Sequence, residues 1–245
     1  MDQNWSELTG SDLELSKDDC LCLMMNIRQI TSTDLDLMHS NLDEMDALKA
    51  NKIANEQNRR QFIASRLLQK VYLKSIFSSK PDIGLGSYGK PFLKNGSGEF
   101  NITHSGDYLV IAFAHHPIGV DLEKIGDFPE RNFIKDNFFH PGETAELNQL
   151  QDKDFDTAFF TCWTRKEALL KAIGCGLAME TKSFQVSSNP NHPRLIEFPD
   201  AKNCGWKFIN LPEIDPEYVG SICHNRLAMR VRFRYIQSNA KWMES

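Results

Sequence analysis

Residues 100–123 constrain the fold more than any other part of the sequence, because three strand-like runs follow one another closely there. The runs "FNITHSG" and "YLVIAFA" meet at a tight turn over residues 105–107. The tripeptide "HHP" at 115–117 then breaks the pattern before a new run at 118–123. Apolar runs bounded by Gly, Ser, Asp and Pro are typical of paired strands, so this segment predicts a hairpin followed by a third strand.

Helical patterns lie on both sides of this segment. Apolar residues recur near helical spacing between residues 35 and 77, and the second half reads as helical over 130–139, 141–150 and 156–173. Further strands are expected at 20–30, 184–187, 206–211, 218–223 and 228–235. Because both halves mix helices with strands that we expect to be antiparallel, the sequence predicts the α+β class and not an alternating parallel fold.

The chain of 245 residues is long enough for two compact lobes. We place their boundary at the "HHP" break, which gives an N-terminal lobe over 1–116 and a C-terminal lobe over 117–245. The net charge of -5 argues against a dedicated nucleic-acid binder, whose affinity comes largely from neutralising phosphates. The sequence shows neither a secretory signal nor an apolar run of membrane-spanning length, so we expect a cytoplasmic protein with no nucleic acid and no membrane as partner.

The run "GLGSYG" at 84–89 matches the glycines of a dinucleotide-binding fingerprint. That fingerprint requires a helix that starts inside it. Lys90 and Pro91 follow at once, and the residue before a proline is pushed out of helical geometry. The sequence therefore favours a loop at this point and not a Rossmann motif.

Two acidic residues lie two positions apart in the run "GVDLEKI". In a strand, Asp121 and Glu123 project to the same side, while Val120 and Leu122 point into the core. A solvent-facing strand end would explain this pattern. The alternative is a magnesium site, because Mg²⁺ usually takes one or two carboxylates and completes its shell with water and substrate phosphates.

The run "WTRKEALLKAIGCGL" places Glu167 and Lys171 four residues apart, and so on one face of a helix. An exposed ion pair of small energetic value is the ordinary meaning of this spacing. Apolar residues wrap most of the helix, however, which indicates that the acid and the lysine border a cleft. Gly174 and Gly176 supply a left-handed stop for the helix.

The run "THSGDY" allows two interpretations. His104 and Ser105 could belong to a serine hydrolase, but a nucleophile elbow needs glycine two residues before the serine, where Thr103 stands. Neighbouring residues of a strand also cannot easily act on each other as base and nucleophile. A small hydroxyl, an imidazole and a glycine at a strand end suit contact with phosphate better.

Taken in order, these motifs resemble those of the Sfp-type 4'-phosphopantetheinyl transferases. The family pattern has a G-K-P loop, a [ST]-H-S-G strand end, a G-[IV]-D-[ILV]-E segment and a W-[ST]-x-K-E-x-x-x-K helix followed by G-x-G-L. This sequence has "GKPFL", "THSG", "GVDLEKI" and "WTRKEALLKAIGCGL", within residues 60–177. The resemblance implies a pseudo-dimer of two similar α/β lobes, with the active site in the cleft between them.

The resemblance also implies a reaction. The 4'-phosphopantetheine group of coenzyme A would pass to a serine of an acyl, polyketide or peptidyl carrier protein, with release of adenosine 3',5'-bisphosphate. Asp121, Glu123 and Glu167 would hold one Mg²⁺, or Mn²⁺, on the coenzyme A diphosphate. Glu167 would also accept the serine proton, directly or through water, and Lys171 would stabilise the departing bisphosphate. A whole pseudo-dimer in one chain implies a monomer.

By the same resemblance, five residues would contact coenzyme A: Arg60, Lys90, Thr103, His104 and Lys171. Thr103 replaces the commoner serine, which keeps the hydroxyl and adds a methyl group. Where relatives place phosphate-binding lysines further upstream, this sequence has Met45 and Leu48, with Lys49 and Lys52 only nearby. The sequence therefore predicts no counterpart for those two upstream contacts.

Two questions stay open at this stage. A carrier protein could dock on the run "RLAMRVRFRY", where Arg230, Arg232 and Arg234 alternate with apolar residues, or this run could be a solvated strand face. The alternative function is a catalytically inactive protein of the same fold that binds coenzyme A or a nucleotide. The presence of the three acids and the lysine of the expected site favours the enzyme.

Overall fold

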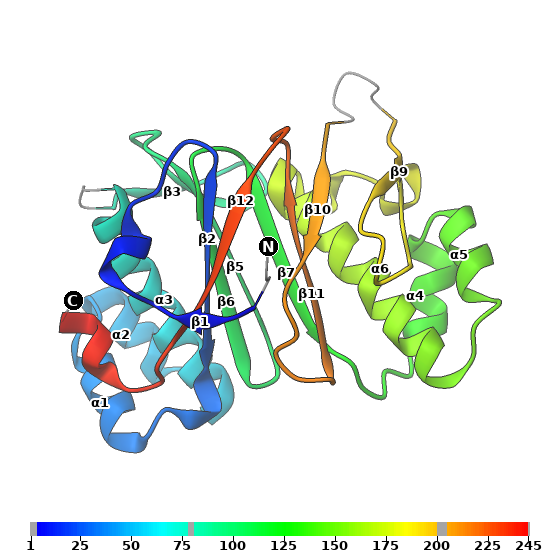
Figure 1. Cartoon of the computed structure of the whole chain (residues 1–245). Helices are drawn as coiled ribbons and strands as arrows, with labels where there is room; N and C mark the ends of the chain where they lie inside the picture. The colour runs from blue at the N-terminus through cyan, green and yellow to red at the C-terminus, as the bar shows by residue number, and fades with distance from the viewer. Residues whose placement is uncertain (1–3, 78–80, 200–204, 245) are drawn as a thin grey trace.

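The computed structural model describes residues 4–77, 81–199 and 205–244, and it confirms the α+β class (Figure 1). The first half contains the helices α1 (Ser32–Ser40), α2 (Glu44–Asn51) and α3 (Glu56–Phe77). The second half contains α4 (Arg131–Phe138), α5 (Pro141–Leu147) and α6 (Asp152–Ile173). The helical pattern expected between 35 and 77 is divided because Asp43 accepts the backbone N–H of Asp46 and so caps a separate helix, α2. None of the helices in the described ranges is both long and apolar enough to cross a membrane.

Two main sheets occupy the centre of the molecule between these two groups of helices (Figure 1). The five-stranded sheet has the order β1-β12-β2-β6-β5, and its strands are β1 (Ser6–Glu7), β2 (Asp19–Asn26), β5 (Glu99–Ser105), β6 (Tyr108–Ala114) and β12 (Arg230–Ile236). The three-stranded sheet has the order β10-β11-β7, with β7 (Ile118–Lys124), β10 (Lys207–Asn210) and β11 (Tyr218–His224). The hairpin β5–β6 and the third strand β7 confirm the prediction made from residues 100–123.

Two short pairs of strands complete the described structure. β3 (Ile83–Leu85) pairs with β4 (Pro91–Leu93), and β8 (Gln185–Val186) pairs with β9 (Leu195–Glu197). The glycine-rich run at 84–89 thus covers the end of β3 and the turn towards β4. No helix begins within the described residues 81–98, which confirms that the run is not a dinucleotide-binding motif.

The expectation of antiparallel strands was wrong for β12, which pairs in parallel with both β1 and β2. Parallel neighbours need a long connection, and residues 27–229 supply it between β2 and β12. The C-terminal strand therefore completes the sheet of the N-terminal half, and the short helix Ala240–Glu244 that follows it lies against α1. The lobe boundary between residues 116 and 117 stays a prediction. The C-terminal strand β12 lies on the far side of this boundary in sequence but belongs to the sheet of the first half.

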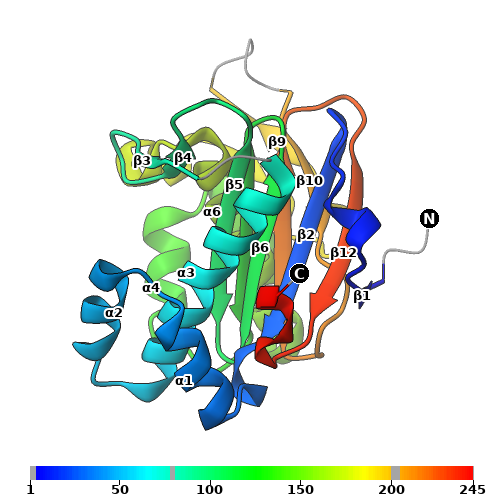
Figure 2. The same ribbon diagram turned by 90° about the vertical axis from the view of Figure 1, so that its left-hand side faces the viewer.

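Alternation along the strands creates the core on both faces of the larger sheet. Leu21, Leu23 and Met25 face α3, which runs alongside β5 and β6 (Figure 2), whereas Cys20 and Cys22 face the other way. That second face packs in one cluster with the apolar residues of β7. A third cluster lies between α6 and the three-stranded sheet, so each main sheet is covered by a long helix.

The two main sheets meet where β5, an edge strand of the larger sheet, runs beside β7, an edge strand of the smaller one. Side chains of β5 bridge the two strands. Asn101 Oδ1 accepts the N–H of Val120 at 2.8 Å, and Ser105 Oγ accepts the N–H of Lys124 at 3.0 Å. We call these contacts of Asn101 and Ser105 with β7 the polar seam. They fix the position of β7 against β5.

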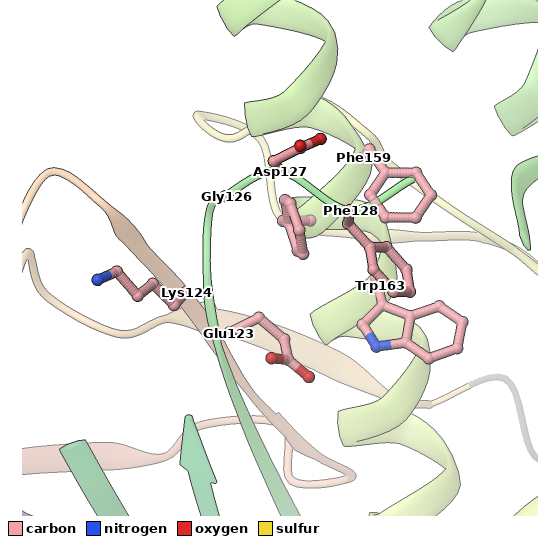
Figure 3. Close-up of a pocket in the computed structure, with 8 residues that line it drawn as sticks. Glu123, Lys124, Gly126, Asp127, Phe128, Phe159 and Trp163 are labelled. Carbon is pink, nitrogen blue, oxygen red and sulfur yellow. The ribbon is translucent and has the colours of Figure 1, made fainter. Parts of the chain in front are cut away.

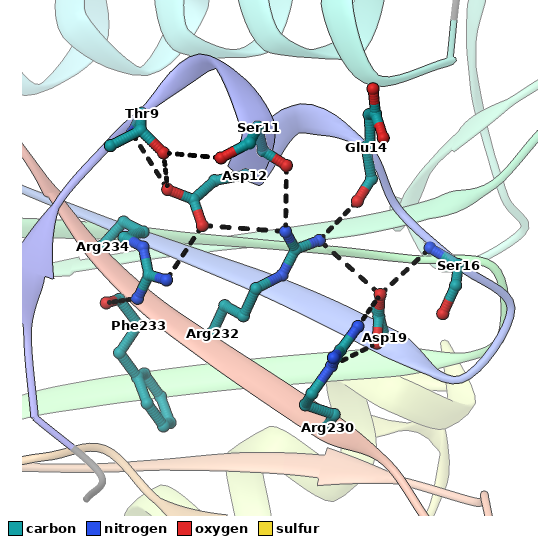
Figure 4. Close-up of polar contacts among 10 residues, drawn as sticks. All are labelled: Thr9, Ser11, Asp12, Glu14, Ser16, Asp19, Arg230, Arg232, Phe233 and Arg234. Carbon is teal, nitrogen blue, oxygen red and sulfur yellow. Dashed lines mark hydrogen bonds and ion pairs between the residues drawn. The ribbon is translucent and has the colours of Figure 1, made fainter.

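A network of ion pairs ties the N-terminal segment to β12 (Figure 4). Arg230 Nε donates to Asp19 Oδ1 at 2.9 Å, and Arg234 Nη2 lies 2.9 Å from Asp12 Oδ1. Arg232 lies 3.7 Å from a carboxylate oxygen of each acid. The arginines alternate along a strand as expected, but pairing with acids of the same chain offsets their charge and leaves little for an acidic partner.

Asp19, one of the two acids in this network, gives an expectation about stability. Hydrogen bonds from Arg230 lower the pKa of Asp19 to about 2, against the opposing effect of burial. A depressed pKa means that the carboxylate stabilises the fold above the unfolded-state pKa near 4, and that this contribution is lost as the pH falls towards about 2. We expect Asp19→Asn to lower the free energy of unfolding by about 2 kcal/mol at pH 6, and by about half of that at pH 3.

Urea denaturation at the two pH values measures this difference. Asp18→Asn is the matched control, because Asp18 pairs with Arg226 on the surface, where 65% of its side chain is exposed. A loss that is equal at pH 6 and pH 3, or equal in the two variants, would contradict the assignment.

Candidate active site

A cavity of about 1020 Å³ opens beside the polar seam, between α3 and α6. β7 contributes Asp121 and Glu123 to its wall, and α6 contributes Glu167 and Lys171. The end of β5 contributes Thr103 and His104, so these six predicted residues line one cavity: Thr103, His104, Asp121, Glu123, Glu167 and Lys171.

Asp121 is buried at the inner end of this cluster. Its Oδ1 atom accepts hydrogen bonds from Lys171 Nζ at 2.6 Å and from Thr103 Oγ1 at 3.1 Å. Its Oδ2 atom is buried and has no hydrogen-bond partner among the residues that the structure describes. Burial raises the pKa of Asp121, and the charge of Lys171 acts in the opposite direction.

The other two acids respond to the charge of Asp121. Burial, and after it the charge of Asp121, raise the pKa of Glu123 to about 7, while a hydrogen bond from Ser105 opposes the change. Burial and the charge of Asp121 also raise the pKa of Glu167, against the effect of Lys171. The three carboxylates therefore repel one another across the cavity. A bound cation would relieve this repulsion.

The residues fit a divalent cation by their donor chemistry. Within residues 4–77, 81–199 and 205–244, no group of three or more His, Cys, Asp or Glu side chains is arranged to hold a metal ion. Mg²⁺ does not need one, because one or two carboxylates, water and substrate phosphates suffice. The unpaired Oδ2 of Asp121 and the carboxylate of Glu123 are oxygen donors of the required kind, in the same cavity.

Glycine at position 119 sets the distance between α6 and β7. A Cβ atom there would collide with the carbonyl oxygen of Ala168 and the backbone nitrogen of Ala172, both on α6. The helix can therefore approach the strand closely only because residue 119 has no side chain. This approach brings Lys171 within reach of Asp121, and Gly174 then ends the helix at φ +78, as predicted.

Two buried cations of α6 anchor the helix to other segments of the chain. Lys166 Nζ lies 2.9 Å from Glu143 Oε2, and both side chains are almost completely buried. Arg165 Nη1 donates to the carbonyl oxygens of Ser187 and Asn189 at 2.6 and 2.8 Å. Sequence reasoning missed these residues, because a lysine and an arginine next to each other are expected to face solvent.

Lys90 lies in the wall of an adjoining cavity of about 270 Å³ that also reaches Glu167 and Lys171. Its ammonium group is 3.2 Å from Glu99 Oε2 and donates to the carbonyl oxygens of Ala172 at 3.1 Å and Ile118 at 3.4 Å. An ammonium group has three donors, so these contacts hold the loop against α6 and β7.

Arg60 does not line either cavity. It pairs with Glu56 Oε1 at 3.0 Å and donates to the carbonyl oxygen of Ile30. Met45 and Leu48 are 65% and 51% exposed on α2, and the expected lack of a phosphate contact there stays a prediction. Any contact of Arg60 with a ligand stays a prediction.

The structure places at the large cavity a positively charged side chain that the sequence analysis did not identify. Arg66 of α3 lines the large cavity, 3.4 Å from Asp46 Oδ1 and with its guanidinium 5.3 Å from the centre of the Phe62 ring. The spacing of Phe62 and Arg66 by four residues was the available signal, since it places both on one face of α3.

An aromatic cavity of about 340 Å³ adjoins the acid cluster (Figure 3). Glu123 and Trp163 belong to its wall and to that of the large cavity. Phe128, Phe159 and Phe160 form the rest of its apolar lining. The acid cluster is therefore flanked by a surface that suits uncharged parts of a ligand.

Comparison with known proteins identifies relatives of this chain. The family model described as the 4'-phosphopantetheinyl transferase superfamily matches residues 117–223. The 4'-phosphopantetheinyl transferase Sfp of Bacillus subtilis is 33% identical over 173 residues, which cover 69% of this chain and 75% of that protein. The 4'-phosphopantetheinyl transferase HetI of Nostoc is 29% identical over 171 residues, covering 66% and 70% of the two chains.

The close contact of α6 with β7 gives a prediction about stability. We expect Gly119→Ala to reduce the free energy of unfolding by about 1–3 kcal/mol, because the added methyl group must push α6 away from the strand. Urea denaturation measures the change. Gly126→Ala is the matched control, since a Cβ atom at Gly126 meets nothing within 4 Å. Equal stability of the two variants would show that α6 is not packed as described.

Proposed function

Because this chain belongs to the Sfp-type 4'-phosphopantetheinyl transferase family, we propose that the cavity between α3 and α6 is where it binds coenzyme A and reacts it with a carrier protein. The chain is an enzyme that transfers the 4'-phosphopantetheine group to carrier proteins. The observation that supports this site above all is the convergence of three acids and Lys171 on one cavity.

The proposed architecture is a pseudo-dimer of two similar lobes, 1–116 and 117–245, with the active site in the cleft between them. The origin of the lining residues supports it, because α3 and β5 come from the first lobe, while β7 and α6 come from the second. With both lobes in one chain, the enzyme would act as a monomer.

The reaction exchanges one phosphorus–oxygen bond for another. The hydroxyl oxygen of the carrier serine forms a bond to the phosphorus that carries the pantetheine arm. The bond from that phosphorus to the bridging oxygen of the diphosphate breaks, and the electron pair leaves with adenosine 3',5'-bisphosphate. The proton of the serine passes to a base, so the protein has to supply a base and to stabilise the charge of the leaving group.

Asp121, Glu123 and Glu167 would hold one Mg²⁺, or Mn²⁺, together with the diphosphate of coenzyme A. The bound ion would neutralise charge on the diphosphate, which three carboxylates would otherwise repel. Asp121 is fixed by Thr103 and Lys171, so one oxygen is held and Oδ2 is left for a ligand.

Glu167 is the base of this proposal. Its carboxylate receives no hydrogen bond or ion pair within the described part of the chain, in contrast to Asp121 and Glu123. Burial and the nearby Asp121 raise the pKa of Glu167, which makes it a better proton acceptor than an exposed glutamate. It would take the serine proton directly or through one water.

Cations and donors around the acids would bind the phosphates. Lys171, paired with Asp121, would turn its charge toward the diphosphate and the departing bisphosphate. Thr103 and His104, in the cavity wall at the end of β5, would contact the remaining phosphate oxygens. Lys90, in the wall of the adjoining cavity, and Arg60 are outer contacts that only the resemblance to the family implies. Burial and the charge of Lys171 lower the pKa of His104, so its imidazole would contact phosphate as a neutral donor at neutral pH.

Mass spectrometry of an apo carrier protein incubated with the enzyme, coenzyme A and Mg²⁺ tests the function. We expect a gain of one phosphopantetheine per carrier, which EDTA abolishes and which releases adenosine 3',5'-bisphosphate. Glu167→Gln should lower kcat by about 10²–10⁴-fold, because it removes the base. Glu180→Gln, an exposed site beyond α6, is the control. No transfer to several carriers, together with normal binding of coenzyme A, would favour the inactive binding protein.

The role of Lys171 gives a separate expectation. Lys171→Met removes a charge that faces the leaving group, and should lower kcat/KM for coenzyme A by about 10²–10³-fold. Steady-state kinetics with a saturating carrier measure it, and Lys153→Met, exposed near the start of the same helix, is the matched control. An unchanged kcat/KM would remove Lys171 from the proposed site.

A further inference from the structure

We infer that Ser105 is a positioning residue for Glu123, and that its hydroxyl holds the glutamate carboxylate in the orientation that binds the divalent cation. This inference rests on the proposed function, because it concerns how the chain prepares one of the acids of that site. It gives Ser105 a role different from that of the nucleophile considered from the sequence.

The hydrogen bonds of Ser105 fix the direction of its proton. A serine hydroxyl has one proton to donate and two lone pairs that accept. The backbone N–H of Lys124 donates to Ser105 Oγ at 3.0 Å, and this uses a lone pair. The hydroxyl proton is therefore directed to Glu123 Oε2, which lies 2.9 Å from Oγ. A bond to an ionised carboxylate is stronger than one between neutral groups.

The polar seam makes this arrangement rigid. Asn101, Thr103 and Ser105 alternate along β5 and so share one face of the strand. Asn101 accepts from the backbone of β7, and Thr103 donates to Asp121. Ser105 is the last member of this series and is bound to two successive residues of β7, Glu123 and Lys124. The same register that places β5 beside β7 therefore places the hydroxyl at the carboxylate.

As a consequence, the two carboxylate oxygens of Glu123 have different partners. Ser105 occupies Oε2, and Oε1 is the oxygen that remains for a ligand in the cavity. A carboxylate that is already oriented loses less rotational freedom when it binds a cation, and partners of this kind typically change metal affinity by 10–100-fold. Ser105 would act on metal affinity through Glu123, without touching coenzyme A.

The test compares Ser105→Ala with Ser105→Thr, which keeps the hydroxyl. Isothermal titration calorimetry measures binding of Mn²⁺ in the presence of coenzyme A, and steady-state kinetics measure the Mg²⁺ concentration for half-maximal rate. We expect Ser105→Ala to weaken Mn²⁺ binding by about tenfold or more and Ser105→Thr by less than about threefold. Ser75→Ala is the control, because the exposed Ser75 hydroxyl donates to the carbonyl oxygen of Val71 in its own helix.

A double-mutant cycle separates positioning from a general structural effect. If Ser105 acts through Glu123, Ser105→Ala should change Mn²⁺ affinity little once Glu123→Gln is present. Unfolding temperatures report whether each variant folds, and Ser105→Cys, a weaker donor of similar size, replaces the alanine variant if that one does not fold.

The outcomes distinguish a failure of the inference about Ser105 from a failure of the proposed metal role. Mn²⁺ binding by Ser105→Ala equal to that of the unaltered protein, or an equal loss in the Glu123→Gln background, would overturn the inference and leave the proposed function standing. No Mn²⁺ binding by the unaltered protein with coenzyme A would overturn the proposed metal role, and with it the inference.

Discussion

The close approach of α6 to β7 at Gly119 is the constraint on which the site depends. The strand carries Asp121 and Glu123, and the helix carries Glu167 and Lys171. These four side chains share a cavity only because the helix backbone lies where a side chain at residue 119 would otherwise be. The pair Lys171–Asp121 at 2.6 Å is a direct result of this contact. Arg165 and Lys166, both buried, anchor the helix to other segments of the chain.

The seam between β5 and β7 joins the two halves of the molecule by side chains. Hydrogen bonds of alternate residues of β5 connect the two sheets along the part of β7 that carries Asp121 and Glu123. Side-chain contacts specify register more narrowly than apolar packing does, because each needs a particular partner at a particular distance. The seam thus sets the position of the acids, while the apolar clusters on either side supply most of the stabilisation.

The sequence predicted the parts of this fold that depend on local pattern. The hairpin at β5–β6, the strand β7 and the helix α6 with its glycine stop follow from periodicity and turn residues, and they carry six of the predicted site residues into one cavity. The parallel pairing of β12 with β2 was not predictable in this way, because it joins residues more than 200 positions apart. The burial of Lys166 and Arg165 was missed for a related reason, since their partners Glu143 and Ser187 come from other segments. The two-residue strand β1 is too short to show a pattern.

The support given to the three acids is graded, and the gradation agrees with different roles. Asp121 receives two donors on one oxygen, Glu123 receives one, and Glu167 receives none within the described ranges. Burial raises the pKa of all three, so the fold alone would be served better by neutral side chains. The donors lie on the two acids of β7, which agrees with their proposed role, because carboxylates that hold a cation have to be ionised and oriented. Glu167 stands on the helix without such restraint, which agrees with its proposed role as the base, because a group that gains and loses a proton in each turnover needs this freedom.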